Sequence, residues 1–214
     1  LHSGALLYAQ GLIYQISLSV YTNLEVIGLS SIISLGLAYL STIPFFRAPV
    51  VALTKLRFLS LVGITFFVGV YSQNQHQLKI ILLTFCVSTF FLTSMIDVVW
   101  SIPKAQYDLG RTLRFNNWEL LKEVVIYGQI DKAFDMLRQN AAIGWMMLTM
   151  IEGMARADGG VGVVLLVQDK ILDLSAILFI QITVMFLGQG QDYAIAGLKN
   201  FFCRYANLTL EKES

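Results

Sequence analysis

The side chains that could perform chemistry in this 214-residue chain are few and scattered. The two cysteines and two histidines (Cys86, Cys203, His2 and His76) show none of the close spacings that metal sites use. The glycine-rich stretch at 158–162 lacks the Lys-Ser or Lys-Thr pair of a phosphate-binding loop. No nucleophile has a recognisable base beside it. We therefore expect neither an enzyme active site nor a metal centre.

Six ionisable residues fall inside or beside strongly apolar segments, and they are the main candidates for a function. They are Glu25, Asp97, Asp135, Arg138, Glu152 and Asp192. Charges within apolar helices are costly and often mark transport paths or helix contacts. We expect all of them except Glu25 and Glu152 to lie at helix ends or helix seams near the cytoplasmic surface of a membrane.

Three residues are candidates for a translocation path or gate: Glu25, Ser31 and Glu152. Glu25 lies in the first apolar segment, where it faces either a partner helix or a polar path. The Gly28-Ser31-Ser34 spacing predicts a helix-packing face first and a path lining second. Glu152 closes an apolar segment before a glycine-rich turn, so an outer gate, a turn cap and a simple interfacial position all stay open.

The elements that must position these residues are membrane helices. Hydrophobic residues make up 56% of the chain and charged residues 14%, whereas soluble domains carry about 25% charged residues. The net charge of +1 argues against a nucleic-acid-binding protein, which shows a clustered basic excess. Five segments approach the roughly 20 apolar residues that a membrane-spanning helix needs. They cover residues 17–40, 56–72, 78–100, 133–154 and 174–198.

The predicted fold is therefore all-α: a polytopic transmembrane helical bundle that forms a single domain over residues 1–214. Residues 4–16 are apolar but short, which favours an interfacial helix or the end of a preceding span. The sequence begins with leucine rather than methionine. We therefore expect a missing N-terminal stretch, and a sixth span in the full chain.

The distribution of lysine and arginine predicts the orientation, because these residues favour short cytoplasmic loops. Twelve of the fifteen lie in residues 41–57, residues 100–138 and the C-terminal tail. The other three lie in the loops at 73–79 and 155–173. Five alternating spans agree with this division. We expect residues 104–132 and the C-terminus to lie in the cytoplasm.

The longest polar interruption, DLGRTLRFNNWELLKEVV at 108–125, predicts two short helices joined at an Asn-Asn turn. We expect Asn117 to be the N-cap of the second helix, with Leu120 in place of the acidic residue of a capping box. Phe115 and Trp118 then protrude beside arginines. Two interpretations remain: a docking knob for a soluble partner, or an interfacial elbow with Trp118 among lipid headgroups.

This segment resembles the cytoplasmic EAA loop of binding-protein-dependent ABC importer permeases, in particular those of the nitrate, sulfonate and taurine type. The loop residues that match by position are Asp108, Gly110, Arg111, Thr112, Leu113 and Trp118, and Arg114, Phe115 and Asn117 complete the loop. Arg114 replaces a glycine of the family, and Tyr127 and Asp131 replace its two prolines. Helix order, loop order and charge distribution agree from about residue 17 to residue 205.

The resemblance implies the permease subunit of a type I ABC importer, which forms a translocation path by alternating access. Residues 104–132 become its coupling loop. The implied partners are ABC ATPase subunits, a second permease copy or paired homologue, an extracytoplasmic substrate-binding protein and membrane lipid, all at a bacterial inner membrane. The ATPase subunits hold ATP and Mg, so this chain binds no cofactor and is not itself an enzyme.

The resemblance also implies a small anionic substrate such as nitrate, a sulfonate, taurine or bicarbonate. The alternative is a divergent, non-transporting permease-like scaffold, or one half of an asymmetric permease pair.

Overall fold

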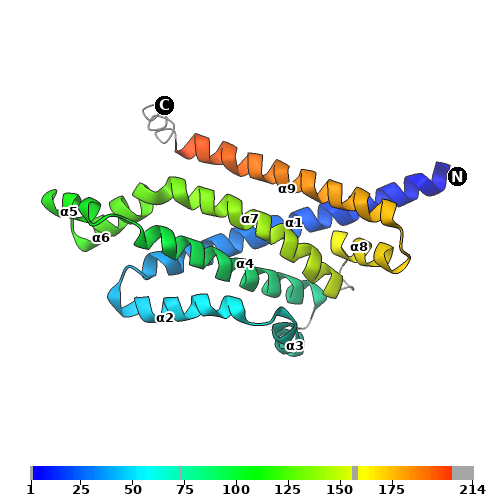
Figure 1. Cartoon of the computed structure of the whole chain (residues 1–214), viewed down its shortest axis with the longest axis horizontal. Helices are drawn as coiled ribbons and strands as arrows, with labels where there is room; N and C mark the ends of the chain where they lie inside the picture. The colour runs from blue at the N-terminus through cyan, green and yellow to red at the C-terminus, as the bar shows by residue number, and fades with distance from the viewer. Residues whose placement is uncertain (1, 73, 156–158, 204–214) are drawn as a thin grey trace. The chain divides into compact units, whose positions relative to one another are not determined.

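The computed structural model describes residues 2–72, 74–155 and 159–203, and every regular element in these ranges is helical. Figure 1 labels the α-helices in chain order. The elements are α1 (His2–Leu40), α2 (Pro44–Thr54), the 3₁₀-helix η1 (Lys55–Phe58), α3 (Leu61–Tyr71), α4 (Gln75–Trp100), α5 (Lys104–Thr112), α6 (Asn117–Leu120), the π-helix η2 (Leu121–Ile126), the 3₁₀-helix η3 (Tyr127–Gln129), α7 (Ile130–Met154), α8 (Val161–Lys170) and α9 (Leu174–Phe202). The all-α prediction is confirmed.

Three of the described helices are long and apolar enough to cross a membrane. They are Gly11–Leu40 of α1, α4 and α9, with mean hydropathies of 1.5, 1.9 and 1.4. Each has more than the roughly 20 residues that the hydrocarbon layer requires. The chain is a multi-pass membrane protein, as its composition predicts. Residues 4–16 are not a separate helix, because α1 runs without interruption from His2 to Leu40.

The prediction of a simple second span at 56–72 is wrong. α3 has 11 residues, which at 1.5 Å per residue cover about 16 Å, about half of the hydrocarbon layer. The segments Pro44–Phe58 and Leu61–Tyr71 are bent by 104° to each other, so together they make at most one broken span. The bend falls where Ser60 takes an extended backbone and so separates the two helices.

The predicted fourth span, 133–154, forms α7, which is a single helix of 25 residues. It is long enough to cross a membrane, but its sequence is less apolar than that of α1, α4 and α9, the three helices that are both long and apolar enough to do so. Its first three turns carry four charged residues: Asp131, Lys132, Asp135 and Arg138. A membrane-spanning α7 remains a prediction.

The helices contribute to two compact units. Unit 1 comprises Leu1–Ser30, Leu59–Val87 and Ala141–Gly190. Its core is built from the buried side chains of α1, α4 and α7, including Val26, Leu82 and Leu148, which are at most 1% exposed. Apolar side chains of α3 and α9 pack against the same core. This core fixes the positions of the polar residues described below.

Unit 2 comprises Ser31–Phe58, Ser88–Asn140 and Gln191–Ser214. One core cluster joins α1, α2, α4 and α7 around Ala38, Phe91 and Met95, all of which are nearly inaccessible. A second cluster joins the end of α4 to η2 through contacts of Val99 and Ile102 with Val125. The second cluster anchors the segment that was predicted to be the coupling loop.

The packing face of α1 differs from the predicted one. Gly28 is exposed, with no atom within 4 Å of the position that a Cβ would take, and Ser31 is half-buried. Ser34 is fully buried, and its hydroxyl donates a hydrogen bond of 2.9 Å to the Ser88 carbonyl. The buried stripe instead follows Ser19, Thr22, Asn23, Val26, Ser30, Ser34 and Ala38. Apart from the adjacent Thr22 and Asn23, the stripe advances in steps of three and four residues, which keep one helix face inside.

Candidate functional site

The predicted coupling loop folds as two short helices, α5 and α6, joined by a four-residue connection. The N-cap of α6 is Asn116, one residue earlier than predicted. The Asn116 side chain accepts a hydrogen bond of 2.8 Å from the Asn117 N–H. The backbone N–H of Asn116 donates one of 2.7 Å to the Glu119 carboxylate. The prediction placed Leu120 at the acidic position, whereas Glu119 completes a capping box because the cap is shifted by one residue.

Arg114 ends α5 in a conformation that normally favours glycine. Its φ is 59°, in the left-handed region. The Arg114 N–H donates to the Arg111 carbonyl at 3.0 Å, and the Phe115 N–H donates to the Gly110 carbonyl at 3.1 Å. This pair of hydrogen bonds is a Schellman motif, in which the left-handed residue is usually glycine. The turn therefore has ordinary geometry, and arginine occupies its glycine position.

Gly110 is required by the close approach of α6 to α5. It is buried, and a Cβ at this position would lie 2.6 Å from Cδ2 of Leu120. Leu120 is itself buried, so it has little space in which to move away. The small residue predicted at this position thus sets the distance between the two helices.

The outer surface of α5 and α6 carries large apolar side chains beside charged ones. Leu109, Leu113 and Trp118 are 64%, 61% and 72% exposed. The remaining exposed members of the predicted set are Asp108, Arg111, Thr112, Arg114 and Asn117. Phe115 was predicted to protrude with Trp118, but it is half-buried, because it packs back toward Gly110. We call the exposed set of eight residues the α5–α6 surface.

A pocket of about 500 Å³ opens beside the α5–α6 surface. Trp118, Arg111 and Tyr107 line it together with the Thr42–Pro44 turn that precedes α2. Burial raises the pKa of the Tyr107 phenol, so the phenol stays protonated and can donate a hydrogen bond at neutral pH. The surface therefore combines a protruding aromatic ring with an adjacent concave site.

The chain stays helical where the resembled family has two prolines. Tyr127 begins η3 and Asp131 lies in the first turn of α7. A proline inside a helix removes a backbone hydrogen bond and bends the helix. Without these prolines, η2 and η3 connect α6 directly to α7 as a continuous run of helical turns.

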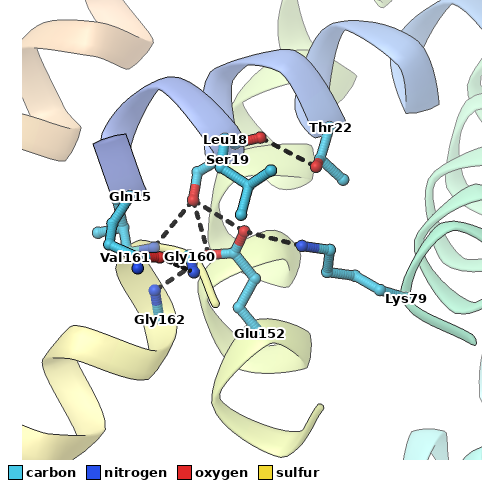
Figure 2. Close-up of polar contacts among 9 residues, drawn as sticks. All are labelled: Gln15, Leu18, Ser19, Thr22, Lys79, Glu152, Gly160, Val161 and Gly162. Atoms are coloured by element: carbon cyan, nitrogen blue, oxygen red, sulfur yellow. Dashed lines mark hydrogen bonds and ion pairs between the residues drawn. The ribbon is translucent and has the colours of Figure 1, made fainter. Parts of the chain in front are cut away.

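A buried polar network lies in unit 1 around the Glu152 carboxylate (Figure 2). Glu152 and Lys79 are both fully buried, and the Lys79 ammonium lies 3.7 Å from Oε1 of Glu152. The Ser19 hydroxyl lies 2.8 Å and 2.9 Å from the two carboxylate oxygens, to which it donates. The Gly162 N–H donates to Oε2 at 3.0 Å. A buried carboxylate needs this kind of pairing, because an isolated buried charge is strongly unfavourable.

The same network holds the N-terminus of α8. The Val161 N–H donates to the Ser19 hydroxyl at 2.9 Å, and the Gly160 N–H donates to the Gln15 side-chain oxygen at 2.5 Å. With the Gly162 bond, three backbone donors at the start of α8 find acceptors on α1 and α7. The Glu152 charge also complements the positive end of the helix dipole.

The glycine-rich stretch is explained by this anchor. Gly159 and Gly160 have φ values of 75° and 119°, which side chains rarely adopt. A Cβ on Gly160 would overlap the Glu152 carboxylate, and one on Gly162 would overlap the Thr149 carbonyl. The glycines let the turn approach α7 closely. Asp158, in the same motif, lies outside the described residues.

The structure places only one of the three path candidates in this network. Glu152 is fully buried and accepts a hydrogen bond from the Gly162 N–H at the start of α8, which agrees with the turn-cap alternative. Glu25 and Ser31 are half-buried on α1 and are not members of the network. Sequence reasoning missed Lys79, Ser19 and Gln15. The only available signal was that Lys79 begins an apolar run instead of standing in a polar loop.

Three of the charged residues singled out in the sequence, Asp135, Arg138 and Asp192, form ion pairs between α7 and α9 in unit 2. The Nε and Nη2 groups of Arg138 donate hydrogen bonds to the two Asp192 carboxylate oxygens, at 2.7 Å and 2.5 Å. Lys199 lies 2.6 Å from the Asp135 carboxylate. These pairs agree with the expected helix seam. Asp97 is exposed on α4.

Comparison with known proteins identifies the fold. No protein-family model matches the sequence, and no curated protein matches it. A chain from the crystal structure of an amino acid ABC transporter with histidines is similar, with a TM-score of 0.69 and 11% identity, over 94% of this chain and 97% of that one. A chain of the MetNI methionine ABC transporter in inward-facing conformations gives a TM-score of 0.67 and 18% identity, over 92% and 97%. The fold is that of the transmembrane subunits of ABC importers.

Proposed function

We propose that this chain is the membrane permease subunit of an ABC importer, and that the α5–α6 surface is where an ABC ATPase subunit docks. The single observation that carries the proposal is the exposed Trp118 beside Arg111 and a concave site, on a chain with the importer fold. Exposed aromatic residues and arginines are the side chains that most often dominate binding at protein interfaces.

The geometry supports docking more than an interfacial elbow. A tryptophan that anchors a helix among lipid headgroups sits beside apolar surface that lipid can cover. Five of the eight residues of the α5–α6 surface are polar or charged, and Arg111 lines the same pocket as Trp118, which favours a polar protein partner. The Schellman turn at Arg114 and the capping box at Asn116 hold the two helices rigidly, so the surface is preorganised for binding.

The proposed mechanism follows from this docking. The partner ATPase subunits hydrolyse ATP, and closure of the ATPase pair moves the α5–α6 surface. The motion passes through η2 and η3 into α7, since these elements are continuous in the chain. The permease then alternates between inward-facing and outward-facing packings. A second permease copy or paired homologue, and an extracytoplasmic binding protein, complete the proposed assembly.

The substrate that we infer from the resemblance is a small anion such as nitrate, a sulfonate, taurine or bicarbonate. The two similar solved structures are described as transporters of an amino acid and of methionine, so they support import of a small polar solute more than this particular class. The buried Glu152 network is our candidate for an element of the gate, because it joins four helices of unit 1, α1, α4, α7 and α8.

Copurification tests the docking proposal. The ATPase is expressed with the chain, and its retention is measured for Trp118→Ala against Tyr71→Ala, a matched exposed aromatic in α3 that is 93% exposed. We expect at least a tenfold loss of ATPase for Trp118→Ala and no change for Tyr71→Ala. Equal retention by both variants would refute the docking site.

The second candidate is a non-transporting permease-like scaffold, or one half of an asymmetric permease pair. The departures at Arg114, Tyr127 and Asp131 favour it. Uptake of labelled substrate into proteoliposomes that contain the whole complex separates the candidates. A scaffold retains the ATPase through Trp118 without ATP-dependent uptake, whereas an importer shows both.

A further inference from the structure

We propose that the chain carries a binding site for an anionic phospholipid in unit 2, at the junction of α2, η1 and the last turn of α4. An open pocket of about 510 Å³ lies there, within the range of about 300–1,000 Å³ typical of ligand sites. Six of its lining residues are Pro44, Arg47, Ala48, Val51, Lys55 and Trp100. Pro44 lines both this pocket and the one beside the α5–α6 surface, but Arg47, Lys55 and Trp100 line only this pocket. The proposed lipid site does not depend on transport.

The pocket lies at the end of a membrane-spanning helix. α4 is one of the three apolar spans, and Trp100 is its last residue. A tryptophan at the end of a span sits at the level of lipid headgroups. Trp100 is 45% exposed, so its ring is accessible from the pocket side. The pocket is thus at the depth where a phospholipid presents its phosphate.

The charges around the pocket complement an anion. Residues 41–60 contain Arg47, Lys55 and Arg57 and no acidic residue. In the part of the chain that the structure describes, none of these three cations forms an ion pair with a carboxylate. The exposed acid nearest to them in α4 is Asp97, one turn before Trp100. The local excess of positive charge therefore needs a counter-ion, and the membrane supplies anionic headgroups.

Arg47 is held in a geometry suited to binding phosphate. Its guanidinium carbon lies 4.5 Å from the centroid of the Trp100 ring, a cation–π contact. Among the described residues the Arg47 guanidinium makes no hydrogen bond or ion pair, so its N–H groups are available to a ligand. Those N–H groups match two oxygens of a phosphate group. Trp100 thus orients Arg47 in addition to placing it at the headgroup level.

The remaining surface of the pocket suits the apolar part of a lipid. Between the two cations, the α2 face that lines the pocket is formed by small and aliphatic residues, Ala48, Val51 and Ala52. Phe45 and Phe58, at the two ends of the α2–η1 segment, are 80% and 77% exposed. A soluble anion would gain nothing from these apolar groups, whereas glycerol and acyl carbons would be covered by them.

The spacing of the cations favours a headgroup with two phosphates. Arg47 and Lys55 are eight residues apart, which corresponds to about 12 Å along a helix. One phosphate can be bound by Arg47 and a second by Lys55, as a cardiolipin headgroup would allow. Phosphatidylglycerol offers one phosphate and should bind less tightly, and phosphatidylcholine, which has no net charge, least of all.

Lipid retention by the full chain tests the proposal. The purified protein is exchanged into nanodiscs of phosphatidylcholine doped with cardiolipin or phosphatidylglycerol, and the retained lipid is measured by native mass spectrometry. We expect Arg47→Gln/Lys55→Gln to lower cardiolipin retention at least fivefold. The control Lys104→Gln/Lys170→Gln removes two charges from exposed residues elsewhere and should leave it unchanged. Equal losses in both double variants would overturn the site.

A variant with the opposite effect keeps the test independent of folding damage. Asp97→Asn removes the negative charge near Trp100, so it should raise cardiolipin retention about twofold or more. A decrease or no change with Asp97→Asn would contradict the proposed electrostatics.

Glycerol 3-phosphate, added at millimolar concentration, should not displace cardiolipin. Displacement of cardiolipin by glycerol 3-phosphate would mean that the site binds soluble anions. If the Arg47 variant lost the ATPase but kept the lipid, the site would be a protein-docking surface. Either result overturns the proposal.

Discussion

The Lys79 ammonium lies 3.7 Å from the Glu152 carboxylate, and both side chains are fully buried in unit 1. The carboxylate is further bound by the Ser19 hydroxyl and the Gly162 N–H. Two opposite charges are therefore removed from water together and compensated by each other and by the start of α8. Removing only one of the two charges should therefore destabilise the protein more than removing Lys79 and Glu152 together.

We predict strong coupling between Lys79 and Glu152. Glu152→Gln leaves the buried ammonium without its carboxylate, which should lower the free energy of unfolding by about 3–5 kcal/mol. Lys79→Met should cost less, because the Glu152 carboxylate keeps the Ser19 and Gly162 donors. Denaturant unfolding of both single variants and of the double variant measures the coupling. The double variant should lose less free energy of unfolding than the two single variants lose in sum. Strictly additive losses would show that the two charges do not interact.

We predict that Arg114→Gly stabilises the coupling segment. The left-handed conformation at φ 59° costs an arginine roughly 1–2 kcal/mol relative to the right-handed one, and glycine avoids this cost. The Schellman hydrogen bonds involve only the backbone, so they persist in the glycine variant. Hydrogen exchange of the residue 110–116 amides measures the effect. Arg114→Val, with a β-branched side chain, should do the reverse. Faster exchange in the glycine variant would contradict the turn assignment.

We predict that Gly110→Ala weakens ATPase docking. The added methyl group would lie 2.6 Å from Cδ2 of the buried Leu120, so the Leu120 side chain must shift within the α5–α6 contact or the two helices must move apart. Retention of the ATPase in copurification should fall several-fold. Gly28→Ala is the matched control, because that helical position is exposed with open space around it. An equal loss in the control would attribute the effect to something other than the spacing of the two helices.

We predict that the α7–α9 ion pair responds to charge reversal. Arg138→Asp places two carboxylates opposite each other at Asp192 and should lower the midpoint of thermal unfolding. Adding Asp192→Arg to that variant should restore much of the lost thermal stability, because the ion pair forms again with the acidic residue on α7 and the basic residue on α9. The neighbouring Asp135–Lys199 pair remains as an internal reference. Failure of the second change to rescue the first would show that the pair contributes little.

The parts of the fold that depend on local sequence were predictable. Long apolar segments of the sequence predicted α1, α4 and α9, because the ability of a helix to span a membrane depends mainly on its length and composition. The Asn-Asn pair indicated the break between α5 and α6, although the cap lies at Asn116. Its position was missed because Glu119 was not considered as the third residue of the helix. The bend before α3 was missed because a run of apolar residues does not reveal a break at Ser60.

The buried network was not predictable from one sequence. Lys79 was counted as a loop charge, and Ser19 had no distinguishing neighbour. Their relation to Glu152 depends on which faces of three distant helices meet, and the pattern within each helix does not determine this. For the same reason the predicted face of α1 is only partly right, with Ser34 buried and Gly28 exposed. Small residues such as Gly28 can face either a partner or the lipid, and only the packed structure distinguishes the two.

The anchor of α8 has a consequence for how the protein is made. The Ser19 hydroxyl and its acceptor on Glu152 are 133 residues apart in the chain. A ribosome adds about 5–20 residues per second. On the order of 10 s therefore pass between the synthesis of Ser19 and that of Glu152. During this interval Ser19 and Gln15 lack the acceptor and the backbone donors that they have in the finished protein. α1 is therefore made before its polar contacts exist, so this network can assemble only after α7 and the start of α8 have been synthesised.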